Sequence, residues 1–323
     1  MTRLKSVVVL TMLVVVALVV GACSSDDDSS SAPVQINLPD GRTVTVPETP
    51  QRIVTLGGQW TDVALSFGVT PVGYYDAQEL QTKTKSPWFG NKLDDSVLID
   101  PNADVVGAVA KLKPDLILAP GFAAMAEGFD KLQKMAPTID KISGQDVDPW
   151  QDMVTLMGTI LHQPDKAKEI IAGVDGKIGA LAAEFPGLKG KTYSFAYLYG
   201  SDQISVLGDQ NDGAAKLFSQ LGLTMSPTAA KKSKETGQPR FQVSTENIDL
   251  LDGDLLVAAS QTPKLQERVE GLPGYKGLPS VKSGAVAMLS TLAITGLNEP
   301  SPNSIPYALD KMKPALKAAA EEK

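Results

Sequence analysis

Cysteine and histidine are nearly absent from this sequence, which contains one of each, Cys23 and His162, in 323 residues. A lone cysteine cannot form an internal disulfide. One histidine cannot supply the several imidazole ligands of a typical zinc or manganese site, so a bare transition-metal site is not expected. The Gly-x-Ser-x-Gly and His-Glu-x-x-His patterns of hydrolases are also missing, and a Ser-His-Asp arrangement would have to use His162 itself. These absences predict a protein with no catalytic residue, no cofactor and no resident metal.

Long apolar runs are limited to residues 7–20, which follow Arg3 and Lys5 and precede Gly21-Ala22-Cys23. The run is shorter than the roughly 20 residues of a membrane-spanning helix but suits the apolar region of a secretory signal. The pattern resembles the bacterial lipobox, in which the cysteine is acylated and the preceding peptide is removed. We therefore interpret residues 1–22 as a lipoprotein signal peptide and Cys23 as the lipidation site, since two acyl chains hold a protein stably on a membrane. A free thiol and a simple membrane anchor are the alternatives.

Basic residues are not in excess either. The whole chain carries 30 Lys and Arg against 37 Asp and Glu, a formal charge of −7. Removing the signal takes away two basic residues and no acid, which leaves 28 against 37, a charge of −9. Nucleic acid binding requires a basic face, so nucleic acid is not an expected partner. Residues 23–33 combine aspartates and serines without apolar periodicity, which predicts a solvated tether between membrane and folded chain.

Strands alternate with helices in the remaining sequence. An alternating pattern around Asp40-Gly41 predicts a hairpin. Buried strands are then expected at the start of QRIVTLGG, in TPVGYY and in KPDLILAPGF, with helical spacing between them. Residues 164–184 predict one helix about 30 Å long, after which KTYSFAYLYG, ISVLG, DLLVAAS and GAVAMLS restart the alternation. This order predicts an α/β fold with two lobes of mostly parallel sheet.

Six segments in sequence carry a family resemblance. They are PQRIVTLGGQWTDVALSFGVTPVG, LKPDLILAP, QPDKAKEII, STENIDLLDGDLLV, LPGYKGLPSVKSGAV and PSPNSIPYALDKMKPAL. Together they resemble the solute-binding proteins of ABC importers for ferric siderophores, haem and cobalamin. The resemblance implies two Rossmann-like lobes, residues 34–162 and 186–323, joined by one long helix within residues 163–185, with ligand bound between the lobes. It implies a monomeric, lipid-anchored receptor on the outer face of the cell membrane that delivers a ferric siderophore to an ABC permease.

Ligands of open α/β sheets bind beyond the carboxyl ends of the strands. Aromatic and guanidinium side chains there could pack on a bulky chelate and donate hydrogen bonds to it. The predicted ligand-binding residues are Gln59, Trp60, Tyr75, Trp88, Tyr199, Arg240 and Phe241. Each aromatic residue could equally be a core residue.

The most basic segment, which contains Lys231, Lys232, Lys234 and Arg240, has two interpretations. It is either a solvated loop or a source of positive charge for an anionic ligand, with Arg240 in the cleft.

The resemblance also implies an acidic residue on each lobe that pairs with permease arginines. Glu246 matches this position in the second lobe. In the first lobe Gly107 stands where glutamate is usual, and Asp104 lies one turn earlier. Asp104 and Glu246 are therefore the predicted docking residues, and Asp62 is a further candidate.

Other functions remain open at this point. Haem is an alternative ligand, because a tyrosine can bind its iron and Tyr75, Tyr197, Tyr199 and Tyr275 are available. A corrinoid is a third ligand within the same fold. A cell-envelope hydrolase and a structural lipoprotein are the alternatives from other classes.

Overall fold

The computed structural model describes residues 32–120, 128–145 and 147–322. Cys23, the predicted signal peptide and most of the predicted tether lie outside these residues. The described chain belongs to one compact unit, Ser31–Lys323. Within it, no helix has the length and apolar character needed to cross a membrane.

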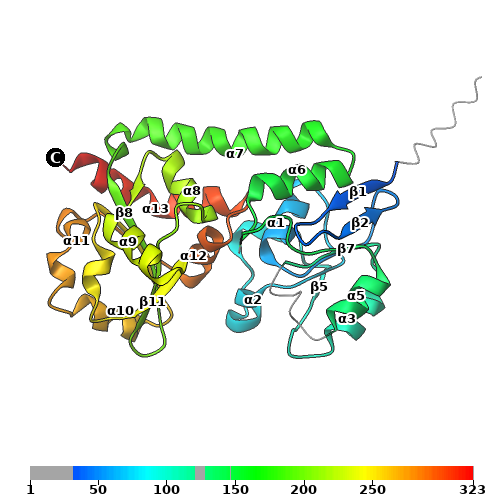
Figure 1. Ribbon diagram of the computed structural model, residues 1–323, viewed down its shortest axis with the longest axis horizontal. Coiled ribbons are helices and arrows are strands. Elements are labelled where there is room, and N and C mark those ends of the chain that lie inside the picture. The colour runs from blue at the N-terminus through cyan, green and yellow to red at the C-terminus, as the bar shows by residue number, and fades with distance from the viewer. Residues whose placement is uncertain (1–31, 121–127, 146, 323) are drawn as a thin grey trace, which may run out of the picture. The chain divides into compact units, whose positions relative to one another are not determined.

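A hairpin and a parallel sheet form the first lobe (Figure 1). The predicted hairpin is β1 (Val34–Asn37) paired antiparallel with β2 (Thr43–Val46), and Gly41 takes a positive φ of 86° in its turn. The sheet has the order β5-β4-β3-β6-β7, and every pairing in it is parallel. Its strands are β3 (Ile53–Thr55), β4 (Gly73–Tyr74), β5 (Val97–Leu98), β6 (Leu116–Leu118) and β7 (Thr138–Ile139).

Both faces of this sheet are covered by helices because its strands are apolar at successive positions. Ile53 and Leu116 belong to the core shared with α1 (Gly58–Ser66) and α6 (Trp150–Ile160). Val54 and Ile117, one position on, pack with α3 (Val105–Leu112) and α5 (Phe129–Met135). The connection after β4 contains α2 (Ala77–Thr82) and the short 3-10 helix η1 (Pro87–Phe89).

One long helix, α7 (Pro164–Glu184), runs from the first lobe to the second, as Figure 1 shows. Pro164 occupies its first turn, where a missing N–H costs no hydrogen bond. Val174, Ile178 and Leu181 are buried at helical spacing and place one face of the helix against the core. His162, immediately before the helix, has a positive φ of 54° and an exposed side chain. The prediction of a single helix at residues 164–184 is confirmed.

The second lobe contains a mixed sheet of order β11-β9-β8-β12-β13, with β10 paired to β8. Pairings among β8, β10, β12 and β13 are parallel, whereas β9 runs antiparallel to both β8 and β11. The strands are β8 (Thr192–Tyr199), β9 (Gln203–Leu207), β10 (Thr224–Met225), β11 (Arg240–Ser244), β12 (Leu255–Ser260) and β13 (Val286–Leu289). The α/β class with two lobes and one long connecting helix is confirmed, and the second sheet is less parallel than the first.

Helices cover both faces of the second sheet as well. One face packs on α8 (Gly213–Gln220), α12 (Thr291–Asn298) and α13 (Ser304–Glu321). The other face packs on the elements that follow β10, β11 and β12, chiefly α9 (Pro227–Thr236), α10 (Pro263–Glu270) and the 3-10 helices η3 (Ile248–Leu251) and η4 (Tyr275–Gly277). The remaining short helices are η2 (Pro186–Leu188) and α11 (Pro279–Ser283).

The basic segment is a helix rather than a loop. Pro227–Thr236 forms α9, which ends at Gly237 in the left-handed region, and Arg240 is the first residue of β11. Lys231 and Lys232 each lie within 4 Å of Glu235 on the exposed side of α9. The interpretation of this segment as a solvated loop is therefore wrong, because Pro at the first helical position and Gly after the last position favour a helix here.

Candidate functional site

A cavity of about 820 Å³ is lined by both halves of the chain. The first lobe contributes Gly144, Gln145 and Val147 from the connection between β7 and α6. The second lobe contributes the connections between β9 and α8 and between α9 and β11, together with the end of α12. These residues are Asp209, Asn211, Asp212, Gly213, Gln238, Pro239, Arg240, Asn298 and Glu299.

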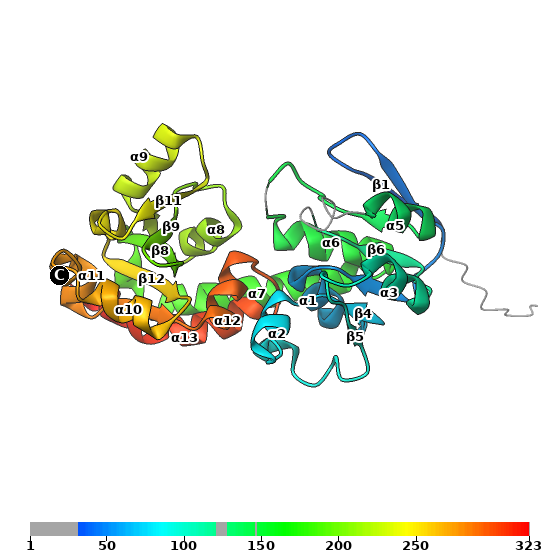
Figure 2. The ribbon, with the colours of Figure 1, turned by 90° about the horizontal axis from the view of Figure 1, so that it is seen from below.

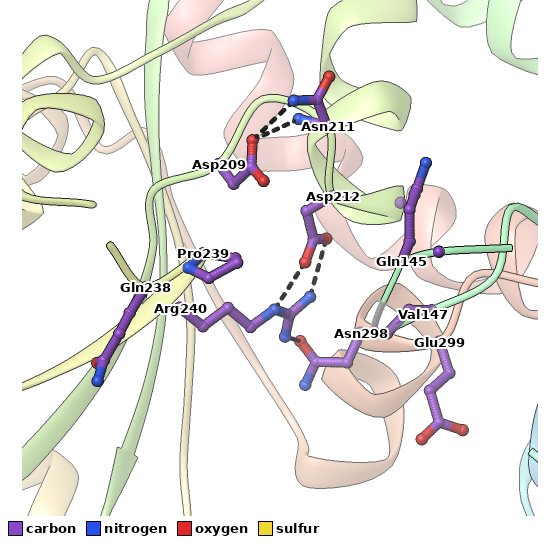
Figure 3. Close-up of a pocket in the computed structure, with 12 residues that line it drawn as sticks. Gln145, Val147, Asp209, Asn211, Asp212, Gln238, Pro239, Arg240, Asn298 and Glu299 are labelled. Atoms are coloured by element: carbon purple, nitrogen blue, oxygen red, sulfur yellow. Dashed lines mark hydrogen bonds and ion pairs between the residues drawn. The ribbon is translucent and has the colours of Figure 1, made fainter. Parts of the chain in front are cut away.

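An ion pair is the main charged feature of this cavity (Figure 3). Arg240 donates to the Asp212 carboxylate from Nε at 2.9 Å and from Nη2 at 3.0 Å. Its Nη1 donates to Asn298 Oδ1, and its guanidinium carbon lies 5.8 Å from the centre of the Phe195 ring. Two parallel hydrogen bonds between a guanidinium and a carboxylate fix both groups strongly. Arg240 is therefore held rigidly, and its charge is already balanced by Asp212.

Asp212 reaches Arg240 because it also begins α8. Its Oδ1 accepts the backbone N–H of Ala214, which makes it the N-cap of that helix. Asp209, three residues earlier, accepts two hydrogen bonds from Asn211, from the backbone N at 2.9 Å and from Nδ2 at 3.2 Å. The loop that carries both acids is thus fixed by its own side chains.

A smaller cavity of about 200 Å³ shares Asn298 and Glu299 with the larger one. Its lining includes residues of α2 and η1 of the first lobe and of the end of α12. Figure 2 shows α2 and α12 from below. Three aromatic side chains, Tyr75, Trp88 and Phe89, line the cavity. Its other lining residues are Gly57, Gly58, Asp76, Ala77, Gln78, Ser86, Thr295 and Ser301.

Packing and hydrogen bonds fix the side chains of this smaller cavity. The Trp88 ring lies 5.6 Å from that of Tyr307 and 5.8 Å from that of Phe89. Asp76 is buried and accepts hydrogen bonds from Ser86 Oγ and from the backbone N–H groups of Gln78 and Glu79. Burial raises the pKa of Tyr75, and the carboxylates of Glu299 and Asp76 add to the increase.

Glu299 stands between the two cavities. Its side chain is open to solvent, although protein surrounds it closely on its other sides. This incomplete hydration raises the pKa of Glu299; Asp76 adds to the increase, and Arg240 opposes it. Figure 3 shows the Glu299 carboxylate directed away from the Arg240–Asp212 pair.

The two lobes are tied together beside these cavities. The Gln59 side chain donates to the carbonyl of Pro300 at 2.7 Å, and Asp62 accepts two hydrogen bonds from Asn303 at 2.7 and 2.8 Å. Asp62 has no exposed surface. Burial raises the pKa of Asp62 even though Ser301 and Asn303 donate to it. Asp62 is thus an internal contact and not an exposed docking residue.

The structure places the predicted ligand residues in two groups. Arg240, Tyr75 and Trp88 line the cavities. Trp60 and Phe241 are 0% and 1% exposed, so the interpretation of these two as ligand contacts is corrected. Trp60 on α1 and Phe241 on β11 point into the apolar core. Gln59 lines neither cavity, because its amide is bonded to Pro300.

Tyr199 also lines neither cavity, because it lies at the far end of its strand. Residue 199 pairs with residue 203, and residue 196 pairs with residue 206, so β9 runs from the end of β8 back toward the beginning of β8. The loop after β9, which lines the larger cavity, is therefore at the opposite edge of the sheet from Tyr199. Tyr199 stacks on Tyr197 instead, with ring centres 6.1 Å apart.

Sequence reasoning missed Asp209, Asp212, Asn298 and Glu299. The signal for the first two is the run GDQNDG directly after a strand, which is rich in residues that cap helices and tighten loops. Asn298 is the last residue of α12 and Glu299 follows it at the C-cap position. Among the described residues, no group of three His, Cys, Asp or Glu side chains could hold a metal ion.

A family model described as "Periplasmic binding protein" matches residues 77–291, and the chain belongs to this family. It is therefore a binding protein of the transport class and not an enzyme. It is 27% identical over 263 residues to the probable siderophore-binding lipoprotein YfiY of Bacillus subtilis, covering 76% of each chain. It is 29% identical over 252 residues to the Fe(3+)-citrate-binding protein YfmC of the same organism, covering 76% of this chain and 75% of the relative.

A solved structure has the same fold. Staphylococcus aureus SirA, crystallised in complex with staphyloferrin B, aligns with a TM-score of 0.73 at 25% identity. The alignment covers 88% of this chain and 98% of SirA.

Proposed function

We propose that this protein is an extracytoplasmic, lipid-anchored receptor that binds a ferric siderophore and delivers it to an ABC permease. The observation that carries the proposal is the cavity of about 820 Å³ lined by both lobes. It is large enough for a bulky chelate and is walled by a fixed guanidinium, carboxylates and amides. The names of the relatives, a siderophore-binding lipoprotein and a ferric-citrate-binding protein, support the same ligand class.

The proposed organisation of the chain follows from this function. Residues 1–22 are the signal peptide, residues 23–33 the lipidated tether, residues 34–162 and 186–323 the two lobes, and residues 163–185 the connection. Cys23 carries the lipid. In the cell, replacing Cys23 with Ala should release the protein from the membrane fraction. Retention of the variant on membranes would contradict the anchor.

Asp104 and Glu246 are the proposed contacts to the permease. Both are exposed. Asp104 also caps α3 by accepting the N–H of Gly107 at 2.8 Å, so Asp104→Asn keeps the cap and removes the charge. Asp104→Asn and Glu246→Gln should lower uptake of iron chelate by cells without changing the affinity of the isolated protein. Equal uptake by wild type and the double variant would exclude these two positions.

Haem is the weaker candidate ligand. Of the four candidate tyrosines, Tyr75 lines the smaller cavity, whereas Tyr197, Tyr199 and Tyr275 line neither of the two cavities described above.

The test is a calorimetric titration of the full-length protein in mild detergent with ferric trihydroxamates, ferric citrate, haemin and cobalamin. A ferric chelate should bind at least tenfold more tightly than haemin or cobalamin. Tighter binding of haemin or cobalamin than of every ferric chelate would overturn the proposed ligand class.

A further inference from the structure

We infer that the smaller cavity binds an alkylammonium group of the ligand, so that the preferred chelate is a neutral or cationic iron complex with a pendant amine. The inference rests on the proposed receptor function and adds the chemical class of the ligand. It is carried by the charges and the aromatic rings of the two cavities.

The first step is the charge balance. Arg240 is the one cation among the described residues that line the two cavities, and Asp212 already neutralises it. Residues 121–127 and 146, which the structure does not describe, contain no Lys or Arg. The lining carboxylates that remain are Asp209, Asp76 and Glu299. A strongly anionic chelate would therefore enter a site with a negative formal charge, and like charges in partly dehydrated surroundings repel strongly.

The second step separates these three carboxylates by their partners. Asp209 accepts two hydrogen bonds from Asn211, and Asp76 accepts three from Ser86 and the start of α2. The Glu299 side chain has no hydrogen-bond partner within the described chain. It is the carboxylate with free acceptor capacity for a ligand.

The third step is the surroundings of Glu299. The smaller cavity next to it is lined by Tyr75, Trp88 and Phe89; Phe89 is almost fully buried, so Tyr75 and Trp88 provide the accessible rings. Aromatic rings attract an ammonium group, most strongly when water is partly excluded. At about 200 Å³ the cavity is too small for a whole iron chelate, but it can hold a short alkylammonium arm. A carboxylate on one side and aromatic rings on the other provide the two interactions that such an arm requires.

The position of Glu299 fits this use. Because it lines both cavities, a chelate in the larger one would have Glu299 at its edge and could extend its arm past Asn298 into the smaller one. A carboxylate oxygen of Glu299 lies 3.6 Å from where a β-carbon at Gly58 would stand. That distance is an ordinary van der Waals contact, so the Glu299 carboxylate lies directly beside the first turn of α1.

The experiment compares two iron complexes that differ only in charge. Ferrioxamine B is a ferric trihydroxamate with a pendant primary ammonium group, and its N-acetyl derivative has the same iron-binding core without the charge. Both are titrated by calorimetry into the full-length protein in mild detergent. We expect the charged complex to bind about tenfold more tightly, the size of one charge-assisted hydrogen bond. Glu299→Gln should reduce this ratio to near one, while Asp209→Asn, the matched change in the larger cavity, should alter both affinities by the same factor.

Three results would count against the inference. Equal affinities of the two complexes for the wild type would overturn it while leaving the receptor function intact. A preference that persists in Glu299→Gln would show that another group selects the amine. If neither these complexes nor any other ferric chelate binds, the receptor function itself fails, and the inference fails with it.

Discussion

Arg240 and Asp212 form a two-fold hydrogen-bonded ion pair at 2.9 and 3.0 Å in the wall of the larger cavity. The Arg240 side chain is 28% exposed and that of Asp212 is 9% exposed. Partly buried pairs of this geometry are coupled more strongly than surface pairs. The pair therefore stabilises the cavity wall, in addition to any contact that it makes with a ligand.

Removing either partner of this pair should destabilise the protein. Arg240→Ala leaves the Asp212 carboxylate without its cation, so we expect a loss of about 1–3 kcal/mol in the free energy of unfolding. The double variant Arg240→Ala/Asp212→Ala should lose less than the sum of the single changes. Urea denaturation of the four proteins measures this coupling. The exposed pair Asp165–Lys168 is the control, since solvent screens it and its coupling should be undetectable.

The buried carboxyl of Asp62 predicts a pH dependence of stability. Burial raises the pKa of Asp62 above its value in the unfolded chain. A group whose pKa is higher in the folded state binds more protons when folded, so its contribution to stability improves as the pH falls. Relative to Asp62→Asn, the wild type should gain stability as the pH falls through the raised pKa toward about 4, the unfolded value.

Denaturation of wild type and Asp62→Asn at a series of pH values provides this comparison. The variant keeps the shape of the side chain and one acceptor for Asn303. The difference between the two stability curves therefore reports the effect of protonating Asp62. A difference that shrinks on acidification would mean that the hydrogen bonds from Ser301 and Asn303 outweigh burial.

Glycine to alanine changes should have opposite effects in α7 and beside β9. Gly176 and Gly179 are exposed within α7, and a β-carbon at either position would meet nothing within 4 Å. Alanine should stabilise the protein there by about 0.5–1 kcal/mol per site, because glycine has the poorer helix propensity. At Gly208 a β-carbon would lie 2.4 Å from that of Ser233 and 2.8 Å from the Ala229 carbonyl oxygen.

Gly208→Ala should therefore cost about 1–3 kcal/mol through overpacking. Thermal unfolding of the three variants tests both the expected stabilisation in α7 and the expected destabilisation at Gly208. Destabilisation by Gly176→Ala would indicate that α7 is required to bend.

The two tryptophans predicted to bind ligand should behave differently on mutation. Trp60 has no exposed surface, and its Nε1 has no hydrogen-bond partner within the described chain. Trp60→Phe should leave chelate affinity unchanged and lower stability by about 1–2 kcal/mol through lost packing. Trp88 lines the smaller cavity, so Trp88→Ala should weaken binding by about 1–2 kcal/mol.

Paired titrations and melting curves distinguish these effects. Weaker binding by Trp60→Phe at unchanged stability would return Trp60 to the ligand site. Wild-type affinity in Trp88→Ala would remove Trp88 from it.

The elements and their order could be predicted because hydrophobic periodicity and helix-end signals are local. Pro164 and the spacing of Val174, Ile178 and Leu181 were sufficient to place α7. The direction of β9 could not be predicted, since a strand pattern is the same in parallel and antiparallel sheets. That direction moves the loop after β9 to the other edge of the sheet, which is why Tyr199 was selected and Asp212 was missed.

Side-chain burial was the second limit. Trp60 and Trp88 both follow strand ends, and nothing local separates them. Trp60 is in the first turn of α1 on the face that packs against the sheet, whereas Trp88 is in a connection that crosses to Tyr307. Which tryptophan faces a cavity depends on contacts between distant parts of the chain. These contacts cannot be read from a single sequence.

The hydrogen bonds of Gln59 and Asp62 to the 300–303 segment join the halves at a second place, away from α7, and the largest apolar cluster contains residues of both halves. Each half also has smaller apolar clusters of its own, but the largest cluster among the described residues is shared. Heating should therefore give one calorimetric peak with equal van't Hoff and measured enthalpies. A hybrid protein in which one half comes from a relative should fold only if the residues that contact the other half are exchanged as well.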